Sequence, residues 1–599
     1  MKDFAKLKDL LGKINYILSR QQKYLAVLVF AMSAVAALLE MLGVSIIIPI
    51  MDMLLNPSAV RQKWYIKPFV EIFSLDTDLS VVWFVCALAI GIYVIKNFYF
   101  IFYNWVSLKY SYKVQRELST RVLGAYMKQG YLFFVNNNSA RLLQGIGADV
   151  ASVYSILNAM FNTTNKLLTI LCIGIFIVFQ SFDMALMLIM LTLLCFIIIQ
   201  FIFRRRMRNN GIIRRKYQQQ CTLVSIQAIQ GNKEILVSNK QDYFVNSFTK
   251  MQKKVNDVSV KVDLGTLMPA YIIEMICVSG LLAAVAVKML GDANPAELIG
   301  KLSTVAVAAF RILPALGTVS SGVNTITMNT SQLAAAYDTL SQVKGLEDEE
   351  KKREKEKYRK VDFQEELEIK NLSFKYPGAQ DSVLRALNLK IHRGTSIALI
   401  GASGAGKTTL ADIILGLLVP DEGCIKMDGV DIQELGSRWN EIVGYVSQTV
   451  YMLDDTIRKN IAFGVEDEKI DDGRVWDALR IAQLDEYVRE LPDQLSTMTG
   501  EHGIRFSGGQ RQRIAIARAV YSDPEILVLD EATAALDNET ETAVMEAIDA
   551  LHGHKTLIIV AHRLTTIRNC DHVYEIGQGV AKERNKEEVL ERNNINHER

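Results

Sequence analysis

The chain has 599 residues, of which 50% are apolar, so it is longer than one domain and rich in apolar side chains. Its mean hydropathy of +0.16 favours a protein that is partly embedded in a membrane. The net charge of +2 argues against a general nucleic-acid binder, and the seven cysteines show no paired CxxC spacing that would indicate a zinc site or a disulfide scaffold.

Residues 4–326, just over half of the chain, have the pattern of membrane-associated helices. Residues 4–18 have apolar side chains at helical spacing with three lysines between them, which predicts a helix lying on a membrane surface. Six longer apolar segments follow, and each can cross a bilayer, because about twenty residues suffice. They lie near residues 24–50, 81–108, 160–180, 183–203, 266–290 and 298–326.

The basic residues orient these segments. Lys and Arg are concentrated in the two long connections that follow segments two and four, and cytoplasmic loops carry such an excess. The outer connections at 181–183 and 291–295 are short and poor in Lys and Arg. We therefore expect a multi-pass protein with its N-terminus and both long connections in the cytoplasm, each connection forming a helix, a short turn and a second helix.

A dense run of mixed charges, residues 345–362, follows the sixth segment and predicts a solvated helix end and a linker. Strand patterns resume at residue 367, and an α/β pattern continues to about residue 585. We therefore divide the chain into an all-α transmembrane domain (1–345), a charged linker (346–364), an α/β domain (365–585) and a polar tail (586–599).

The α/β domain contains a phosphate-binding loop. The stretch SIALIGASGAGKTT, residues 396–409, is a short apolar strand, a glycine-rich loop and the start of a helix. In such a loop backbone N–H groups turn toward a phosphate, the lysine reaches the β and γ oxygens, and the next hydroxyl can ligate Mg²⁺. The candidate nucleotide-binding residues are Gly401, Ser403, Gly404, Gly406, Lys407, Thr408 and Thr409.

A second apolar strand, residues 526–529, ends in two acids, Asp530 and Glu531. Asp530 is placed to hold Mg²⁺, and Glu531 to orient or deprotonate the attacking water, as phosphoryl transfer to water requires. The alternative is that the pair only caps the following helix.

Between the two motifs lies FSGGQRQR, residues 506–513, at the start of a helical run. In this position it resembles the signature of the ABC (ATP-binding cassette) ATPases. Ser507, Gly508, Gly509 and Gln510 would form a second anion site at a helix N-terminus. In that family this site closes on the ATP held by the phosphate loop of another cassette, so the resemblance implies ATP and Mg²⁺ as ligands.

Other motifs follow in the family's order. The resemblance implies that Tyr376, in FKYPG, stacks on adenine and that Gln448, in YVSQ, senses Mg²⁺ and couples to the membrane domain. It also implies that Asp537, in AALD, lies in the loop crossing the dimer interface and that His562, in VAHRL, contacts the γ-phosphate. The stretch GEHG at 500–503 resembles the loop specific to exporters.

Two positions depart from the family pattern, Phe506 for the usual Leu and Ala534 for the usual Ser. Neither removes a catalytic group, so an active ATP hydrolase is implied, with Glu531, His562 and Gln448 as its catalytic residues.

The whole chain resembles half of a type I ABC exporter, in which a six-helix transmembrane domain precedes an α/β P-loop ATPase. Since each ATP site needs a phosphate loop and an SGGQ from different cassettes, a homodimer in a bacterial inner (plasma) membrane is implied, with the ATPase domain cytoplasmic. The family also implies short coupling helices, by position near Asp149–Tyr154 and Ala228–Leu236. Solvated helical hairpins are the alternative there.

Among exporters, the chain most resembles bacterial lipid-linked oligosaccharide flippases of the PglK type. The likeness rests on LLEMLGVSIIIP (38–49), AAFRILPA (308–315) and the outer loop with WYIKPFVEIF (64–73). It implies ATP-driven flipping of a lipid-pyrophosphate oligosaccharide by alternating access. The loop's aromatic residues suit the outer leaflet, although an ordinary outer loop is the alternative.

Four ionisable residues lie inside the apolar segments: Glu40, Lys96, Glu274 and Arg311. Charges there usually face a partner or an aqueous cavity. Flippases of the resembled type carry cavity arginines near the positions of Lys96 and Arg311, so these two are the candidate contacts for the cargo pyrophosphate. The alternative is internal pairing, for instance of Glu40 with Lys96.

Other functions stay open at this point. An exporter of drugs, peptides or other lipids would share every ATPase motif, and an ATP-gated channel or regulatory subunit would share the architecture. A soluble ABC protein acting on nucleic acid is contradicted by the six apolar segments, so no nucleic-acid partner is expected.

Overall fold

The computed structural model describes residues 2–46, 50, 67–72, 77–180, 182–289, 295–355, 362–531, 538–561 and 563–590. It divides into two compact units. The first comprises Met1–Gln129 and Phe134–Asp348, and the second comprises Gly130–Phe133 and Glu349–Arg599.

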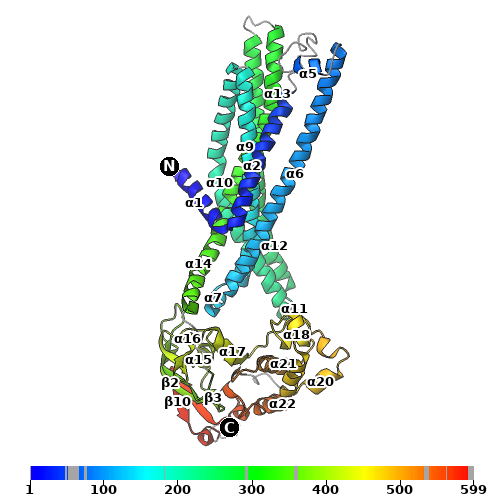
Figure 1. The fold of residues 1–599 in the computed structure, drawn as a ribbon. Coiled ribbons are helices and arrows are strands. Elements are labelled where there is room, and N and C mark those ends of the chain that lie inside the picture. Colours follow the sequence, from blue (N-terminus) through cyan, green and yellow to red (C-terminus); the bar gives the residue numbers. More distant parts are fainter. Residues whose placement is uncertain are drawn as a thin grey trace. The chain divides into compact units, whose positions relative to one another are not determined.

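The first unit is built from long helices that run alongside one another (Figure 1). Each of the six predicted segments falls on one of them, which confirms the expected all-α six-helix architecture. These helices are α2 (Arg20–Ser45), α6 (Asp78–Met127), α9 (Val150–Gln180), α10 (Phe182–Gln230), α12 (Gln241–Met289) and α13 (Pro295–Met328), with α1 (Lys2–Ile17) before and α14 (Thr330–Lys355) after them.

Apolar packing joins these helices. Helix α9 packs against α2, α6, α10 and α13, and α12 packs against α10 and α13. A buried apolar cluster links α2, α9, α10, α12 and α13 through Val44, Ile173, Ile177, Ile199, Ile273, Cys277, Ala309, Ile312, Leu313 and Leu316.

The outer faces of the same helices are apolar too. Phe98, Phe179, Phe201 and Phe310 are each more than two thirds exposed. Large exposed apolar surfaces of this kind suit contact with lipid. Within the described ranges, four stretches are long and apolar enough to cross a membrane: Arg20–Ser45, Leu79–Met127, Ser139–Phe179 and Gln241–Gly280.

The first long connection turns at a different place from the one predicted. The turn holds the short helix α7 (Tyr131–Asn136), which precedes α8 (Ser139–Gln144), whereas Asp149–Tyr154 lies in a helical run that continues through η1 (Gly145–Asp149) into α9. The signal for the turn is the run of asparagines at 136–138. Asn138 caps α8 by accepting a hydrogen bond from the N–H of Ala140 at 2.8 Å, and Asn favours such caps and turns.

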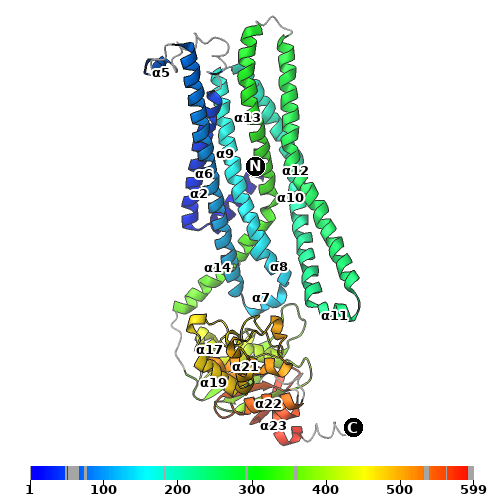
Figure 2. The ribbon, with the colours of Figure 1, turned by 90° about the vertical axis from the view of Figure 1, so that its right-hand side faces the viewer.

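The second long connection turns close to the predicted place. Helix α11 (Asn232–Val237) lies between the ends of α10 and α12 and overlaps the expected Ala228–Leu236 (Figure 2). In the outer loop, α5 (Lys67–Ile72) is described, but Trp64 and Tyr65, whose rings were expected at the outer leaflet, lie outside the described residues.

The second unit contains two sheets. An antiparallel sheet has the strand order β2-β1-β4-β5, and a mostly parallel sheet has the order β10-β9-β3-β8-β7-β6. The antiparallel strands are β1 (Glu366–Phe374), β2 (Leu384–His392), β4 (Glu422–Met427) and β5 (Val430–Asp431). The other sheet is formed by β3 (Ser396–Ile400), β6 (Val443–Val446), β7 (Ile526–Asp530), β8 (Thr556–Val560), β9 (His572–Gly577) and the antiparallel edge strand β10 (Val580–Arg584).

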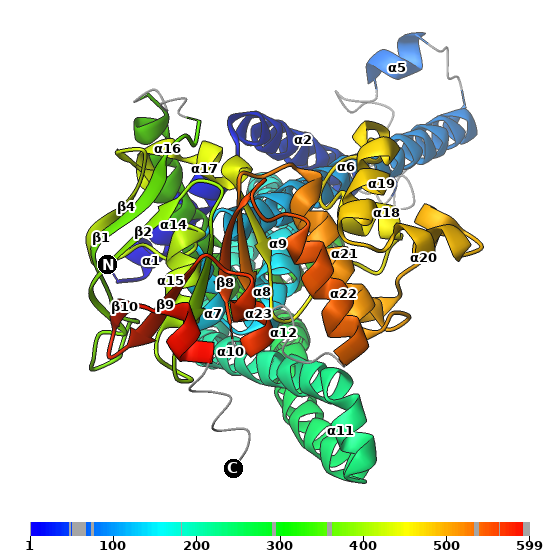
Figure 3. The same cartoon turned by 90° about the horizontal axis from the view of Figure 1, so that it is seen from below.

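Strands β7 and β8 are buried along their whole length and consist almost entirely of Ile, Leu and Val. This is typical of parallel strands covered on both faces. Figure 3 shows α21 (Gly508–Tyr521) and α22 (Asn538–Asp549) side by side in this unit. Its other helices are α15 (Lys407–Ile414), α16 (Ile432–Leu435), α17 (Ser437–Ile442), α18 (Ile457–Ile461), η2 (Asp467–Lys469), α19 (Asp472–Ile481), α20 (Asp485–Glu490), η3 (Gln494–Ser496), η4 (Glu501–Gly503) and α23 (Leu564–Arg568).

The strand order positions the predicted motifs. Strand β8 lies between β3 and β7, β6 lies beyond β7, and all four run parallel. Because the carboxyl ends of parallel strands meet at one edge, the loops after β3, β6 and β7 gather there, where α/β sheets usually bind ligands.

Candidate functional site

The predicted phosphate loop joins β3 to α15. Two of its glycines are required by geometry, since Gly401 has a φ of +145° and Gly406 a φ of +102°. A Cβ at Gly401 would lie 2.3 Å from the carbonyl oxygen of Ile576, and one at Gly406 would lie 2.9 Å from Leu384 Cδ2. Only glycine fits both conformation and space, so the loop can turn its backbone tightly at this edge of the sheet.

Lys407 folds back over the loop. Its Nζ donates to the carbonyl oxygens of Gly401 at 2.8 Å and Ala402 at 3.1 Å, and the residue is only 5% exposed. Burial lowers the pKa of the Lys407 ammonium, while the carboxylates of Glu531 and Asp530 act in the opposite direction. The cation is thus held by weak carbonyl acceptors that phosphate oxygens could replace.

Other predicted residues line the same turn. Ser403, Gly404 and Thr408 are exposed, whereas Thr409 is buried. The hydroxyl of Thr409 lies 3.2 Å from that of Tyr376, whose ring also meets Phe374 edge to face. The aromatic side chain expected to stack on adenine therefore lies next to the first turn of α15.

The two acids lie at the end of β7. Asp530 is buried at the last position of the strand, and Glu531 follows it with a φ of +48°. A left-handed conformation in a non-glycine residue costs of the order of 1–3 kcal/mol and tends to occur at functional sites. Gln448 Nε2 donates to Glu531 Oε2 at 2.5 Å, so the loops after β6 and β7 bring together two of the predicted catalytic side chains.

The SGGQ motif forms the N-terminus of α21. Ser507 Oγ accepts a hydrogen bond from the Gln510 N–H at 3.3 Å, and the Ser507 N–H donates to Gln510 Oε1 at 2.8 Å. This reciprocal capping box fixes the first turn of the helix. Ser507 and Gly508 are exposed, and Gly509 is buried.

Three predicted positions, Asp537, His562 and Ala534, lie outside the described residues. Within the described ranges, no cluster of three or more His, Cys, Asp or Glu could hold a metal ion by itself.

In the helical unit, the two predicted cargo cations share one carboxylate. Lys96 Nζ lies 3.1 Å from Glu40 Oε2, and Arg311 Nη1 lies 3.2 Å from Glu40 Oε1. The Lys96 ammonium also lies 4.6 Å from the centre of the Tyr93 ring, and the Tyr93 hydroxyl donates to the Gly43 carbonyl at 3.0 Å. The structure therefore has the internal pairing that the sequence offers as the alternative, and it adds Arg311 to the pair.

Comparison with known proteins decides the family. A family model described as "ABC transporter transmembrane region" matches residues 24–284, and one described as "ABC transporter" matches residues 384–534. Together they cover more than half of the chain. The chain belongs to the ABC transporter family.

Curated relatives of this ABC transporter include proteins named ATP-dependent lipid A-core flippase. Those of Salmonella typhimurium and of Escherichia coli K12 are each 31% identical to this chain over 532 and 531 residues, which is 87% of this chain and 88% of theirs. A solved structure described as a bacterial Atm1-family ABC exporter with ATP bound matches with a TM-score of 0.75 over 96% of both chains. At 20% identity, this match shows the fold alone.

These findings confirm several predictions. The chain is a type I ABC exporter half-transporter, with a transmembrane domain followed by an α/β ATPase domain. It is a multi-pass protein of the plasma membrane and couples ATP hydrolysis to transport.

One group near the site was missed by the sequence analysis. Asp412 lies in α15, five residues after Lys407, and is 8% exposed. Burial, together with the nearby Asp530 carboxylate, raises the pKa of Asp412 to about 6. The sequence does carry a signal for it, because Asp412 is the one acid of α15 and every other residue of this helix is apolar or belongs to the phosphate-binding motif.

Asp412→Asn should stabilise the transporter most at pH 8, less at pH 5 and hardly at all below about pH 4. The raised pKa means that the folded state favours the protonated carboxyl. The stabilisation of the folded state by this proton is fully present below about pH 4 and is lost as the pH rises through about 6. At 1.36 kcal/mol per pKa unit, the gain at pH 8 is at most about 3 kcal/mol. Thermal unfolding of the purified full-length protein at pH 8 and pH 5 measures it, with the exposed Asp493→Asn as control. Equal shifts at both pH values would contradict the assignment.

Proposed function

We propose that this exporter is a homodimer that uses Mg²⁺-ATP to flip a lipid-linked substrate with an anionic headgroup, and that a lipid-pyrophosphate oligosaccharide is its first candidate cargo. The observation that carries the cargo class is the cluster of Glu40, Lys96 and Arg311 in the helical unit. Two cations on one carboxylate leave a net positive charge among apolar helices.

Arg311 is the member of the cluster best suited to meet an anion. Its side chain is 40% exposed, whereas those of Lys96 and Glu40 are 5% and 11% exposed. A guanidinium has five N–H donors in a planar fork, and Glu40 lies close to only one of its nitrogens. The remaining donors suit two phosphate oxygens, which would compete with the Glu40 carboxylate for the same cation.

The relatives support this class of cargo, since proteins named ATP-dependent lipid A-core flippase align with most of the chain. Their name concerns a glycolipid rather than a lipid-pyrophosphate oligosaccharide. Export of drugs, peptides or other lipids remains the alternative that a panel of substrates must separate.

For the ATP site, we propose the roles that the sequence motifs suggest. Gly401, Gly404 and Gly406 let the backbone surround the phosphates, and Ser403, Lys407 and Thr409 bind their oxygens. Tyr376 stacks on the adenine. Thr408, Gln448 and Asp530 would hold Mg²⁺, which neutralises phosphate charge when bound. The fit is supported by the turns at Gly401 and Gly406, which only glycine fits, and by the buried Lys407 ammonium, which donates to two carbonyl oxygens of the loop.

Glu531 is the proposed general base. Its carboxylate accepts a hydrogen bond from Gln448 and can hold the attacking water in line with the γ-phosphate. His562 and Asp537 complete the site by analogy with the family. The SGGQ motif, Ser507 to Gln510, offers exposed backbone groups at the start of a 14-residue helix, and we propose that it binds the ATP held by the partner chain.

Glu531→Gln should retain ATP binding and lose nearly all hydrolysis. The amide keeps the size of the side chain and cannot accept the proton from water, whereas the phosphate contacts survive. Nucleotide binding to the purified protein and phosphate release measure the two properties separately. Hydrolysis at half the wild-type rate would rule out this role for Glu531.

Mixed dimers should rescue two inactive chains. In a chain with Lys407→Ala, the phosphate loop no longer binds the β and γ oxygens. In a chain with Ser507→Arg and Gly508→Asp, the SGGQ motif no longer binds ATP. If each ATP site takes one motif from each chain, a mixed dimer keeps one intact site. Differently tagged chains, co-expressed and purified through both tags, give the ATPase rate. Full activity of a strictly monomeric wild-type chain would refute the composite site.

Removing the proposed headgroup contacts should impair flipping. Arg311→Gln and Lys96→Gln should each reduce the flipping of a lipid-pyrophosphate oligosaccharide about tenfold, since a charge-assisted hydrogen bond contributes about 1.5–3 kcal/mol. Glu40→Gln should instead lower the cargo concentration for half-maximal ATPase stimulation, because it removes the competing carboxylate.

Flipping and ATPase stimulation are measured in proteoliposomes that contain the pyrophosphate lipid, a lipid A-type glycolipid, a neutral glycolipid or a peptide.

The matched control is Glu274→Gln, an exposed acid of α12 outside the cluster. Thermal unfolding of each variant separates loss of folding from loss of cargo binding. Wild-type flipping by both cation variants, or stimulation by peptide alone, would contradict the proposed cargo.

A further inference from the structure

The segment that carries Gln448 is attached to helix α21 at two points. Near its start, Gln512 Nε2 donates to the carbonyl oxygen of Ser447 at 3.4 Å. Near its end, Arg518 Nη1 donates to the carbonyl oxygen of Tyr451 at 2.7 Å. Both side chains belong to the helix that begins with SGGQ, so this helix holds the backbone on either side of Gln448.

Arg518 is the more strongly bound of the two anchors. Its Nε donates to the carbonyl oxygen of Asn460 at 2.7 Å, and its Nη2 donates to Asn460 Oδ1 at 3.0 Å. The guanidinium carbon lies 4.8 Å from the centre of the Phe463 ring. Burial lowers the pKa of Arg518. A buried guanidinium with this many contacts fixes its neighbours firmly, because each lost contact would leave a desolvated charge.

Asn460 extends the network to the end of the same segment. It is fully buried, and its side chain accepts from the Leu453 N–H at 2.9 Å and donates to the Leu453 carbonyl at 3.1 Å. Thr499, also fully buried, donates to the same carbonyl at 2.6 Å and immediately precedes the GEHG stretch. The network therefore ties the segment 447–453, α18 and the GEHG loop to α21.

We propose that Arg518 is a positioning residue for ATP hydrolysis, which acts by holding Gln448 against Glu531. This rests on the roles proposed above for those two residues. Arg518 lies eleven residues after Ser507, about 16 Å along a rigid helix. A displacement of the SGGQ end of α21 is thereby passed to the backbone beside Gln448, and the Gln448–Glu531 hydrogen bond responds to the position of the signature helix.

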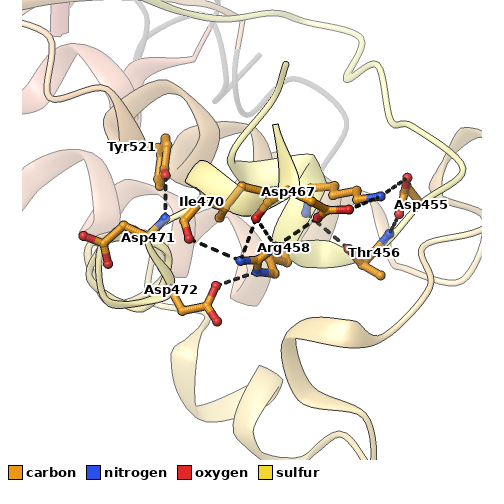
Figure 4. Close-up of polar contacts among 9 residues, drawn as sticks. Asp455, Thr456, Arg458, Asp467, Ile470, Asp471, Asp472 and Tyr521 are labelled. Atoms are coloured by element: carbon orange, nitrogen blue, oxygen red, sulfur yellow. Dashed lines mark hydrogen bonds and ion pairs between the residues drawn. The ribbon is translucent and has the colours of Figure 1, made fainter. Parts of the chain in front are cut away.

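The chain provides a matched control in Arg458 of α18 (Figure 4). It also has a network of contacts, with Asp467 at 3.0 Å, Asp472 at 2.5 Å and the carbonyl of Ile470 at 3.2 Å. These contacts hold the loop between α18 and α19, which does not include the Gln448 segment. Loss of Arg458 should therefore lower stability without a specific effect on catalysis.

The test compares Arg518→Met with Arg458→Met in the full-length transporter. Arg518→Met should lower the kcat for ATP about tenfold, because Gln448 would no longer be held against Glu531, and it should change KM by less than twofold, because the phosphate loop is untouched. Arg518→Lys should recover part of the rate, because it restores the charge and one donor. Arg458→Met should keep kcat within twofold of the wild type.

The decisive measurement is the same change in a Gln448→Ala background. If Arg518 acts through Gln448, Arg518→Met should lower the residual kcat by less than twofold there. A full tenfold loss in that background, or an equal loss of kcat from Arg458→Met, would overturn the proposal. Unfolding midpoints identify variants that fail to fold, in which case Arg518→Lys carries the comparison. Full activity of Gln448→Ala alone would refute the role of Gln448 itself, and this inference with it.

Discussion

The chemistry of the second unit depends on the parallel pairing of β6, β7, β8 and β3. Strands buried on both faces must consist of apolar residues, so polar groups can appear only where the strands end. Parallel pairing brings those ends to one edge, where the phosphate loop, Gln448 and the Asp530–Glu531 pair all follow a strand. Residues from three loops, spread over more than a hundred positions of the sequence, meet there.

The motifs and helices were predictable because each depends on local physics. A glycine-rich turn before Lys407, an acidic pair after an apolar strand, and apolar runs long enough to cross a bilayer can be recognised without knowing what packs against them. The position of α7 was missed, although the run of asparagines at 136–138 marks the turn. The expected place, Asp149–Tyr154, rested on position within the family pattern, whereas the cap at Asn138 marks the start of α8 by local chemistry.

Side-chain networks between distant segments were predictable only in part. The sequence offers the Glu40–Lys96 pair as an alternative, but it does not show that Arg311 joins the pair. That contact depends on which faces α2, α6 and α13 turn toward one another, and helical periodicity does not define this rotation. Likewise, Arg518 looks like an ordinary basic residue on a helix. Its contacts with Tyr451 and Asn460 arise from the packing of α18 and the Gln448 segment against α21, which no local pattern encodes.

The close approach of Gly401 to Ile576 gives the end of the chain an unexpected importance. The phosphate loop rests on the backbone of β9, and the turn that follows β9 accepts a hydrogen bond through Gly579 from the N–H of Arg385 in β2. The hairpin of β9 and β10 contains none of the recognised motifs, yet the backbone of β9 packs against Gly401 of the phosphate loop. A chain cut before this hairpin would retain every sequence signature of an ATPase and lack the surface on which its first loop is built.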